Sequence, residues 1–197
     1  MRSEVDICNL ALNHIAQNTI TSLNEASNPA RKCKLYFPVA KDAVLRAHDW
    51  NFATKIELLA LIADETIPGW DYLYARPANC LYIRKIYNEA NIGNALPTQY
   101  KEIKTTNGSR AIACDIDQAY IEFTQTVTDP NDFDSNFVEA LSFKLAAMIA
   151  KSLTGDLALA EKMEQKSMLI VSDARRVNSS ERNNQDDPYN GYVEARA

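Results

Sequence analysis

Apolar residues near the start of the chain recur at intervals of three and four, which predicts an amphipathic helix from about Ser3 to Gln17. Ser3 and Asp6 have the spacing of a capping box at its N-terminus. A second helical pattern begins at Asn28-Pro29, an N-cap residue followed by a proline at the first helical position. Its apolar positions are Cys33, Phe37, Ala40, Val44 and Ala47. Pro38 lies inside this pattern and predicts a kink or a local break near Lys34–Phe37.

The pattern changes to period two after about residue 53. The alternating segments are Trp70–Tyr74, Leu81–Tyr87, Tyr100–Ile103, Arg110–Cys114 and Ala119–Val127. Asn107-Gly108 is a strong hairpin-turn dipeptide between two of them. These segments predict a small antiparallel sheet or barrel-like subdomain of about five strands.

Helical periodicity returns after Asp129-Pro130. One helix is predicted to end at Gly155, and Asp156 is placed to cap the next, which extends from about Leu157 to Val177. The two should form an antiparallel hairpin, and they must pack on the first pair because neither pair covers its own apolar stripe. The prediction is an α+β fold with a core bundle of about four helices, an inserted β subdomain and a flexible C-terminal tail.

The corresponding segments are 1–53 for the first helices of the core, 54–128 for the β subdomain, 129–177 for the last helices and 178–197 for an extended tail. The tail carries two tyrosines and a valine in a polar setting, which is typical either of a docking peptide that orders on binding or of a merely disordered end. Its candidate docking residues are Tyr189, Tyr192, Val193 and Arg196. Trp50 and Phe52 are candidate anchors of the helix-to-sheet junction.

The composition is that of an ordinary globular protein, with 197 residues, 46% of them hydrophobic and 24% charged. Its five scattered glycines exclude the usual Gly-rich nucleotide-binding loops. A net charge of −5 without a basic stripe argues against tight, sequence-specific DNA binding. No window approaches 18 apolar residues and the N-terminus lacks a signal peptide, so we expect a protein made in a cytoplasm, with no membrane partner.

Candidate chemistry is sparse. The four cysteines form no CxxC pair and only two histidines accompany them, so we expect reduced, buried cysteines, no metal and no cofactor. His14 reads as a hydrogen-bonded structural histidine, and His48 and Asp49, adjacent in sequence, are poorly placed to act as a dyad. We therefore expect no catalytic residues and no enzyme. The alternative is a peptidoglycan-cleaving enzyme that uses acidic residues such as Asp132 and Asp134.

Several blocks occur together in a characteristic order. They are Ser3–Leu12, His14–Gln17, Ile20–Leu23, Ala30–Cys33, Tyr36–Pro38, Val44–Ala53, Trp70–Tyr74, Pro77–Leu81, Phe133–Leu141, Leu145–Ala150 and Leu153–Asp156. Over about residues 3–177 the chain thereby resembles the tail tubular protein A family, the head-to-tail adaptors of short-tailed bacteriophages. The chain departs from the family pattern at Ala16, where glycine is common, and at Asp49, where proline is common.

The resemblance implies a structural virion protein at the head–tail junction. Members of the family form a ring, typically a dodecamer, that binds the portal protein, connects it to the tail nozzle protein and surrounds double-stranded DNA without binding it specifically. It implies that the C-terminal segment docks on the portal, and it leaves open an adaptor of another phage class.

Overall fold

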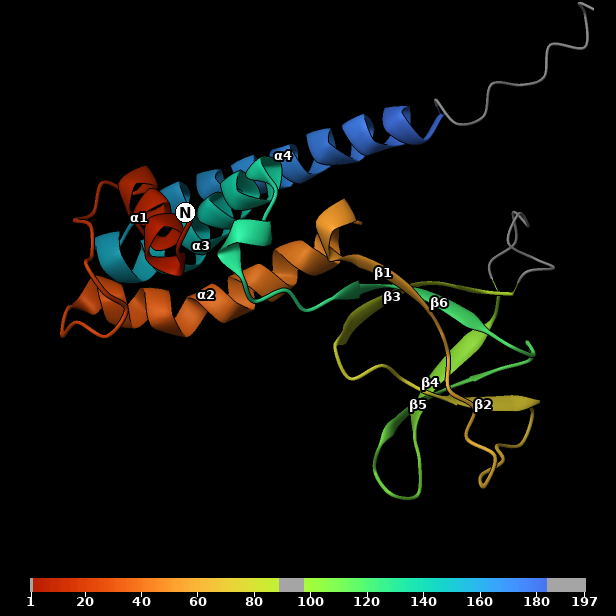
Figure 1. Ribbon diagram of the computed structural model, residues 1–197. Helices are drawn as coiled ribbons and strands as arrows, with labels where there is room; N and C mark the ends of the chain where they lie inside the picture. The colour runs from red at the N-terminus through yellow and green to blue at the C-terminus, as the bar shows by residue number, and fades with distance from the viewer. Residues whose placement is uncertain (1, 89–97, 184–197) are drawn as a thin grey trace, which may run out of the picture. The chain divides into compact units, whose positions relative to one another are not determined.

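Figure 1 shows the computed structural model, which describes residues 2–88 and 98–183, with the side chains of 178–183 excepted. The chain divides into two compact units. One comprises Met1–His48 and Phe133–Ala197 and is called the helical unit below; the other, Asp49–Asp132, is called the β unit. The fold is α+β, as predicted, and the described residues form four α-helices and two small antiparallel sheets. Within the described ranges, no helix combines the length and apolar character needed to cross a membrane.

The first helix, α1, spans Glu4–His14 and begins with the predicted capping box. The Ser3 hydroxyl accepts a hydrogen bond from the Asp6 amide at 3.1 Å, and the Asp6 carboxylate accepts one from the Ser3 amide at 2.9 Å. The helix ends three residues before Gln17, because Ala16 adopts a left-handed backbone conformation with φ of 53°. A side chain at this conformation is strained, which fits the frequent glycine at this position in the family that the sequence resembles.

The second helix, α2, spans Asn28–Ala47 without interruption, so of the kink or local break predicted near Lys34–Phe37 the break does not occur. Ser27 caps it, and its hydroxyl accepts a hydrogen bond from the Ala30 amide at 3.2 Å. Pro38 cannot donate a hydrogen bond to the Lys34 carbonyl one turn earlier. Both residues are exposed, so water is able to satisfy that carbonyl and the helix continues.

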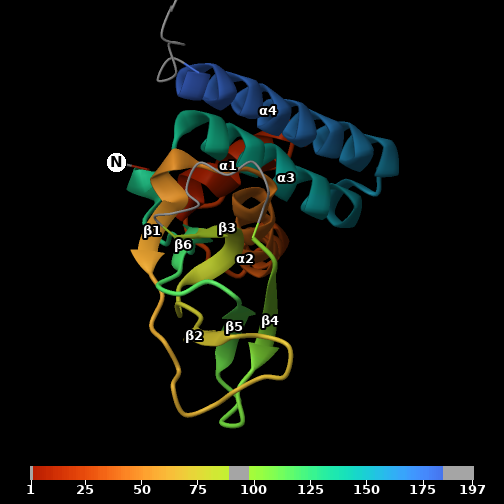
Figure 2. The same ribbon diagram turned by 90° about the vertical axis from the view of Figure 1, so that its right-hand side faces the viewer.

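The last two helices are α3, Ser135–Thr154, and α4, Leu157–Asn183, and they lie side by side in Figures 1 and 2. Gly155 ends α3 with φ of 76°, and the Asp156 carboxylate accepts a hydrogen bond from the Leu159 amide at 3.0 Å. The tail predicted from residue 178 begins too early, since α4 continues to Asn183. Helix propagation costs little once a helix is formed, and the helix breakers Pro188 and Gly191 come later.

The core of the helical unit is organised around α3, which packs against α1, α2 and α4. Its largest fully buried side chains are Ile7, Leu12, Leu45, Phe137, Leu141, Leu145 and Ile149. Phe133 and Phe137 meet edge to face, with their ring centroids 4.9 Å apart. Helices of both pairs contribute to this core, so the two pairs pack on each other as the apolar stripes predicted.

In the described residues of the β unit there are six strands rather than about five, in two three-stranded antiparallel sheets. One sheet has the order β1-β6-β3 and the other β2-β5-β4. Their bounds are β1 Thr54–Leu58, β2 Tyr72–Ala75, β3 Cys80–Tyr87, β4 Tyr100–Lys104, β5 Arg110–Cys114 and β6 Tyr120–Gln125. Short 3-10 helices flank the unit at Asn51–Ala53 and Pro130–Asp132. The strand missing from the prediction is β1, whose apolar residues do not face the core.

The β4–β5 hairpin has its turn at Asn107-Gly108, as predicted from this dipeptide. Lys104 pairs with Arg110, and Gly108 has φ of 79° in the turn between them. The core of the β unit gathers side chains from both sheets, among them Ile83, Ile86, Ile112, Ile121 and Phe123. The Tyr74 hydroxyl donates a hydrogen bond to the buried Ile116 carbonyl at 2.8 Å, so a polar group in this core is satisfied.

Candidate functional site

The predicted docking residues of the tail, Tyr189, Tyr192, Val193 and Arg196, lie outside the described residues. The other predicted site residues, Trp50 and Phe52, open the β unit in sequence. Trp50 is buried, and its ring centroid lies 6.3 Å from that of Phe52. Its carbonyl accepts hydrogen bonds from the Thr54 hydroxyl and the Ala53 amide, both at 2.9 Å. Trp50 therefore fixes the turn that leads into β1.

The acidic residues considered for catalysis take part in turns and caps. The Asp134 carboxylate caps α3 by accepting a hydrogen bond from the Asn136 amide at 2.7 Å. Asp132 ends a 3-10 helix of the β unit, whereas Asp134 belongs to the helical unit. Asp129 accepts from the Asn131 amide and side chain, and these hydrogen bonds lower the pKa of its carboxyl group.

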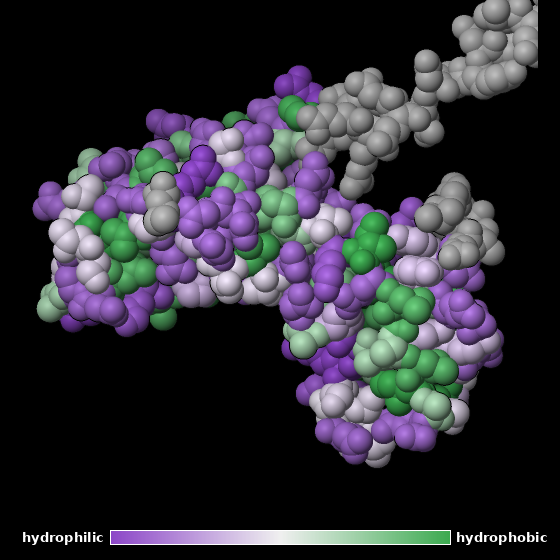
Figure 3. Space-filling view, in the orientation of Figure 1, coloured by the Kyte–Doolittle hydropathy of each residue, from purple (hydrophilic) through white to green (hydrophobic). Residues whose placement is uncertain are grey.

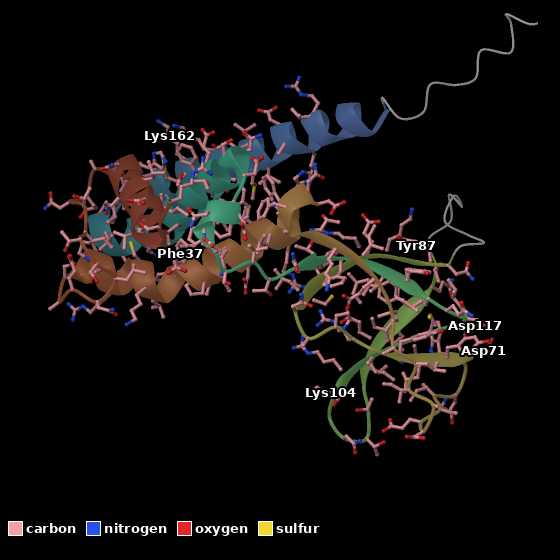
Figure 4. The ribbon with its side chains drawn as sticks, viewed as in Figure 1. Phe37, Asp71, Tyr87, Lys104, Asp117 and Lys162 are labelled. Carbon is pink, nitrogen blue, oxygen red and sulfur yellow. The ribbon has the colours of Figure 1, made fainter. Side chains whose placement is uncertain are left out.

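Two further acidic residues, Asp115 and Asp117, lie in the turn between β5 and β6, and Asp117 is labelled in Figure 4. The Asp115 carboxylate accepts a hydrogen bond from the Asp71 amide at 3.0 Å and thereby joins this turn to the residue before β2. Such hydrogen bonds from a short carboxylate to a nearby backbone amide are typical of turn chemistry.

His14 is hydrogen-bonded, as predicted from its position. Its Nε2 lies 3.0 Å from the Ser142 hydroxyl, which itself donates to the Glu139 carbonyl at 2.8 Å. Since a hydroxyl has one proton, His14 Nε2 must be the donor to Ser142. The imidazole stacks on Phe143 with centroids 3.9 Å apart. Burial, followed by the Lys166 charge, lowers the pKa of His14, so the neutral ring is favoured.

His48 is buried at the end of α2 in an extended conformation. The neighbouring Asp49 carboxylate accepts a hydrogen bond from the Thr54 hydroxyl at 2.9 Å and lies 3.9 Å from Arg84 Nε. Asp49 therefore acts within the β unit as the partner of Thr54 and Arg84.

All four cysteines are reduced and buried, as predicted. Cys8 of α1 and Cys33 of α2 share a thiol hydrogen bond, which together with burial raises the pKa of Cys8. Within residues 2–88 and 98–183, no cluster of three or more histidine, cysteine, aspartate or glutamate side chains is placed to hold a metal.

The surface of the helical unit carries a groove of about 350 Å³, called the α2/α4 groove below. Its lining residues are Ala43, Val44, Ala47, Lys144, Glu164, Ser167, Met168, Val171 and Arg175. Leu35 and Val39 precede Ala43 and Ala47 at intervals of four, so this row of α2 stays apolar along the helix. Leu35 is 63% exposed, Val39 56% and Met168 62%. An exposed apolar surface of this extent is typical of an interaction site.

Polar contacts hold the walls of the α2/α4 groove together. Lys144 of α3 forms a salt bridge with Glu164 of α4, and Arg175 of α4 donates a hydrogen bond to the Ala47 carbonyl at the end of α2. The buried Ser167 hydroxyl donates to the Ala140 carbonyl at 2.9 Å. Because these groups bond to one another, the groove offers a partner mainly apolar contacts along α2 and Met168.

The sequence reasoning missed the α2/α4 groove. The sequence feature that could have indicated it is the second apolar row of α2, formed by Leu35 and Val39 beside the buried row that contains Phe37. A helix that is apolar on more than one side needs more than one partner.

No protein-family model matches the chain, and a search of curated proteins finds no match.

Proposed function

We propose that this protein is a ring-forming structural virion protein of a short-tailed bacteriophage, an adaptor between the portal protein and the tail nozzle protein. The ordered sequence blocks that resemble the tail tubular protein A family support this role. The structural observation that carries the proposal is the α2/α4 groove with the exposed Met168, together with Leu35 and Val39, which are exposed on the apolar row of α2 that leads to Ala43 and Ala47 of the groove. An adaptor must offer such an apolar surface to its neighbours in the assembly.

A ring requires two different faces on each subunit, because each contact in it is head to tail. The helical unit supplies one face with the α2/α4 groove. Twelve copies would bring a formal charge of about −60 (twelve times −5) around the DNA path, and this charge favours sliding over binding. The C-terminal residues Tyr189, Tyr192, Val193 and Arg196 remain the proposed contact with the portal.

The test is electron microscopy of the purified protein mixed with its portal, which should show a ring at the portal base. Met168→Asp places a charge on the α2/α4 groove, and Val39→Asp places one on the exposed apolar row of α2 that leads to it. Each should abolish the ring while the monomer keeps its circular dichroism spectrum. The matched control is Leu10→Asp, since Leu10 is an exposed leucine that does not line the groove. A protein that neither binds the portal nor occurs in purified virions would overturn the proposal.

The tail is tested separately by deleting residues 184–197, a truncation that leaves all of α4 in place. This variant should keep its helical content and lose affinity for the portal. The glycan-cleaving alternative is tested by incubation with peptidoglycan: cleavage that Asp132→Asn abolishes would replace the adaptor role with an enzymatic one.

A further inference from the structure

Strand β1 has an inverted pattern of apolar and charged side chains. Among the described residues its only strand neighbour in the sheet is β6, so it is an edge strand there. Ile56 and Leu58, each 55% exposed, occupy one face. Lys55 and Glu57 occupy the other face, opposite the buried core residues Phe123 and Ile121 of β6. A strand with one face toward the core and one toward water normally has its apolar residues on the core face, so the pattern of β1 is the reverse of the usual one.

Figure 3 shows apolar side chains gathered on the face of the β unit along which β1 runs in Figure 1. The large apolar side chains exposed on and just after this strand are Ile56, Leu58 and Leu61. On the opposite face of β1, Lys55 Nζ lies 2.6 Å from Glu57 Oε2, so the two charges neutralise each other within the monomer. β1 therefore combines an apolar face with a strand edge that carries no net charge.

The edge of β1 that faces away from β6 carries backbone groups that no described strand pairs with. The Leu59 amide donates to the Ala119 carbonyl at 2.9 Å, which makes Leu59 a residue bonded toward β6. Since bonding alternates along an antiparallel pair, Lys55 and Glu57 also bond toward β6, and the amides of Ile56 and Leu58 point away from it. Among the strands of residues 2–88 and 98–183, β1 pairs with β6, so these two amides face the open edge of the sheet. They form a template for another strand.

We propose that β1 pairs antiparallel with β1 of a second copy of this chain about a two-fold axis through Ile56. In this register Ile56 lies opposite Ile56 of the other copy and exchanges backbone hydrogen bonds with it. Lys55 lies opposite Glu57, and Thr54 lies opposite Leu58. The two three-stranded sheets join into one continuous sheet across the axis, with the apolar side chains of both copies on the same face.

Charge complementarity identifies the partner as a second copy. Charged side chains on an edge strand normally discourage pairing, but Lys55 and Glu57 have opposite signs and lie symmetrically about Ile56. The two-fold register therefore creates two cross-strand ion pairs at once. Both are non-hydrogen-bonded pairs, in which opposing side chains approach most closely.

This contact does not rest on the proposed adaptor role. A two-fold contact uses the same patch on both subunits and closes on itself, whereas a ring needs a head-to-tail contact. The strand is short and the contact is small, so the dimer should be weak and depend on protein concentration.

The experiment is sedimentation velocity of the full chain from micromolar to millimolar concentration. The wild-type protein should shift from monomer to dimer. In the two-fold register, Lys55→Glu places two acidic side chains opposite each other and Glu57→Lys places two basic ones. Each variant should therefore raise the dissociation constant of the dimer about tenfold or more. The double variant K55E/E57K restores complementarity and should dimerise as the wild type does. An equimolar mixture of the two single variants should form heterodimers, because their strands complement each other.

Ile56→Pro removes the outward amide without removing a hydrogen bond to β6, and it should abolish the dimer. Thermal unfolding of each variant identifies any loss of fold. If one single variant unfolds, the double variant K55E/E57K still tests the proposed register. A wild-type chain that stays monomeric up to millimolar concentration would overturn the proposal. So would a dimer that persists in I56P, or single variants that fail to recover on mixing.

Discussion

The helical unit and the β unit leave different kinds of surface for association. Helices satisfy their backbone internally, so the α2/α4 groove offers a partner mainly side chains such as Ala47 and Met168. The β unit exposes Ile56 and Leu58 on an edge strand whose outward amides face no other strand of the described residues. Binding at the groove should therefore depend on apolar volume and shape, whereas binding at the strand should depend on register and charge.

The two units also build their cores differently. In the helical unit one helix, α3, packs against the other three. In the β unit the core depends on pairing between distant segments, such as Leu58 of β1 with Tyr120 of β6. We expect the β unit to be more sensitive to changes that alter strand pairing, and the predictions below test how far the two units differ.

The largest effect should come from truncating one aromatic ring in each core. Phe137 and Phe123 are both fully buried, so Phe137→Ala and Phe123→Ala should each cost about 3–5 kcal/mol of unfolding free energy. Both tryptophans, Trp50 and Trp70, lie in the β unit, so their fluorescence reports that unit while far-UV circular dichroism reports mainly the helices.

In urea unfolding, Phe137→Ala should shift chiefly the circular dichroism transition and Phe123→Ala chiefly the fluorescence transition. Phe→Leu at the same positions is the milder control. If each variant shifts both transitions equally, the units unfold as one and the comparison breaks down.

Trp50→Ala tests where the β unit is anchored. The side chain is buried at the start of the unit, so its removal should cost about 3–5 kcal/mol. Phe52→Ala, at a half-buried neighbour, should cost less. Chemical denaturation followed by circular dichroism measures both. A near-neutral Trp50→Ala would instead assign this side chain to an intersubunit surface.

Smaller, opposite effects should follow from the left-handed positions of the two units. Gly108 has φ of 79° in the β hairpin and no atom near its missing Cβ, so Gly108→Ala should cost about 1–2 kcal/mol through backbone strain alone. Ala16 has φ of 53° after α1, and Ala16→Gly should gain up to about 1 kcal/mol. Thermal unfolding measures both changes. An Ala16→Gly variant less stable than the wild type would contradict this account of how α1 ends.

The smallest effect concerns pH and the helical unit alone. Burial and Lys166 lower the pKa of His14 below its ordinary 6.5, so folding favours the neutral ring. Stability from this group is therefore full above pH 6.5 and declines as the pH falls through the lowered pKa of the folded state. His14→Gln should flatten the dependence of unfolding free energy on pH between neutrality and pH 5. An unchanged slope would show that the lowered pKa of His14 does not contribute to this dependence.

Several local features followed directly from the sequence. The Ser3–Asp6 capping box, the Gly155 helix end and the Asn107-Gly108 hairpin each depend on residues a few positions apart, and all three are present. The candidate groove was not predictable in the same way. Ser167 is polar in sequence but buried, because its hydroxyl reaches the Ala140 carbonyl on another helix.

Strand β1 was missed for a related reason. Its alternation is regular, but its apolar residues face outward, and only the pairing with β6 shows which face is the core. A period-two pattern defines two faces without saying which one is buried.

The sequence by itself determined the α+β class, the order of helices and most strands, and the caps and turns, because these depend on short-range periodicity and local hydrogen bonding. Only the tertiary structure decided that α2 continues through Pro38, that a second apolar row of α2 remains exposed beside α4, and that Ile56 and Leu58 lie outside the core. Burial is a property of what packs against a residue, and that partner is remote in sequence.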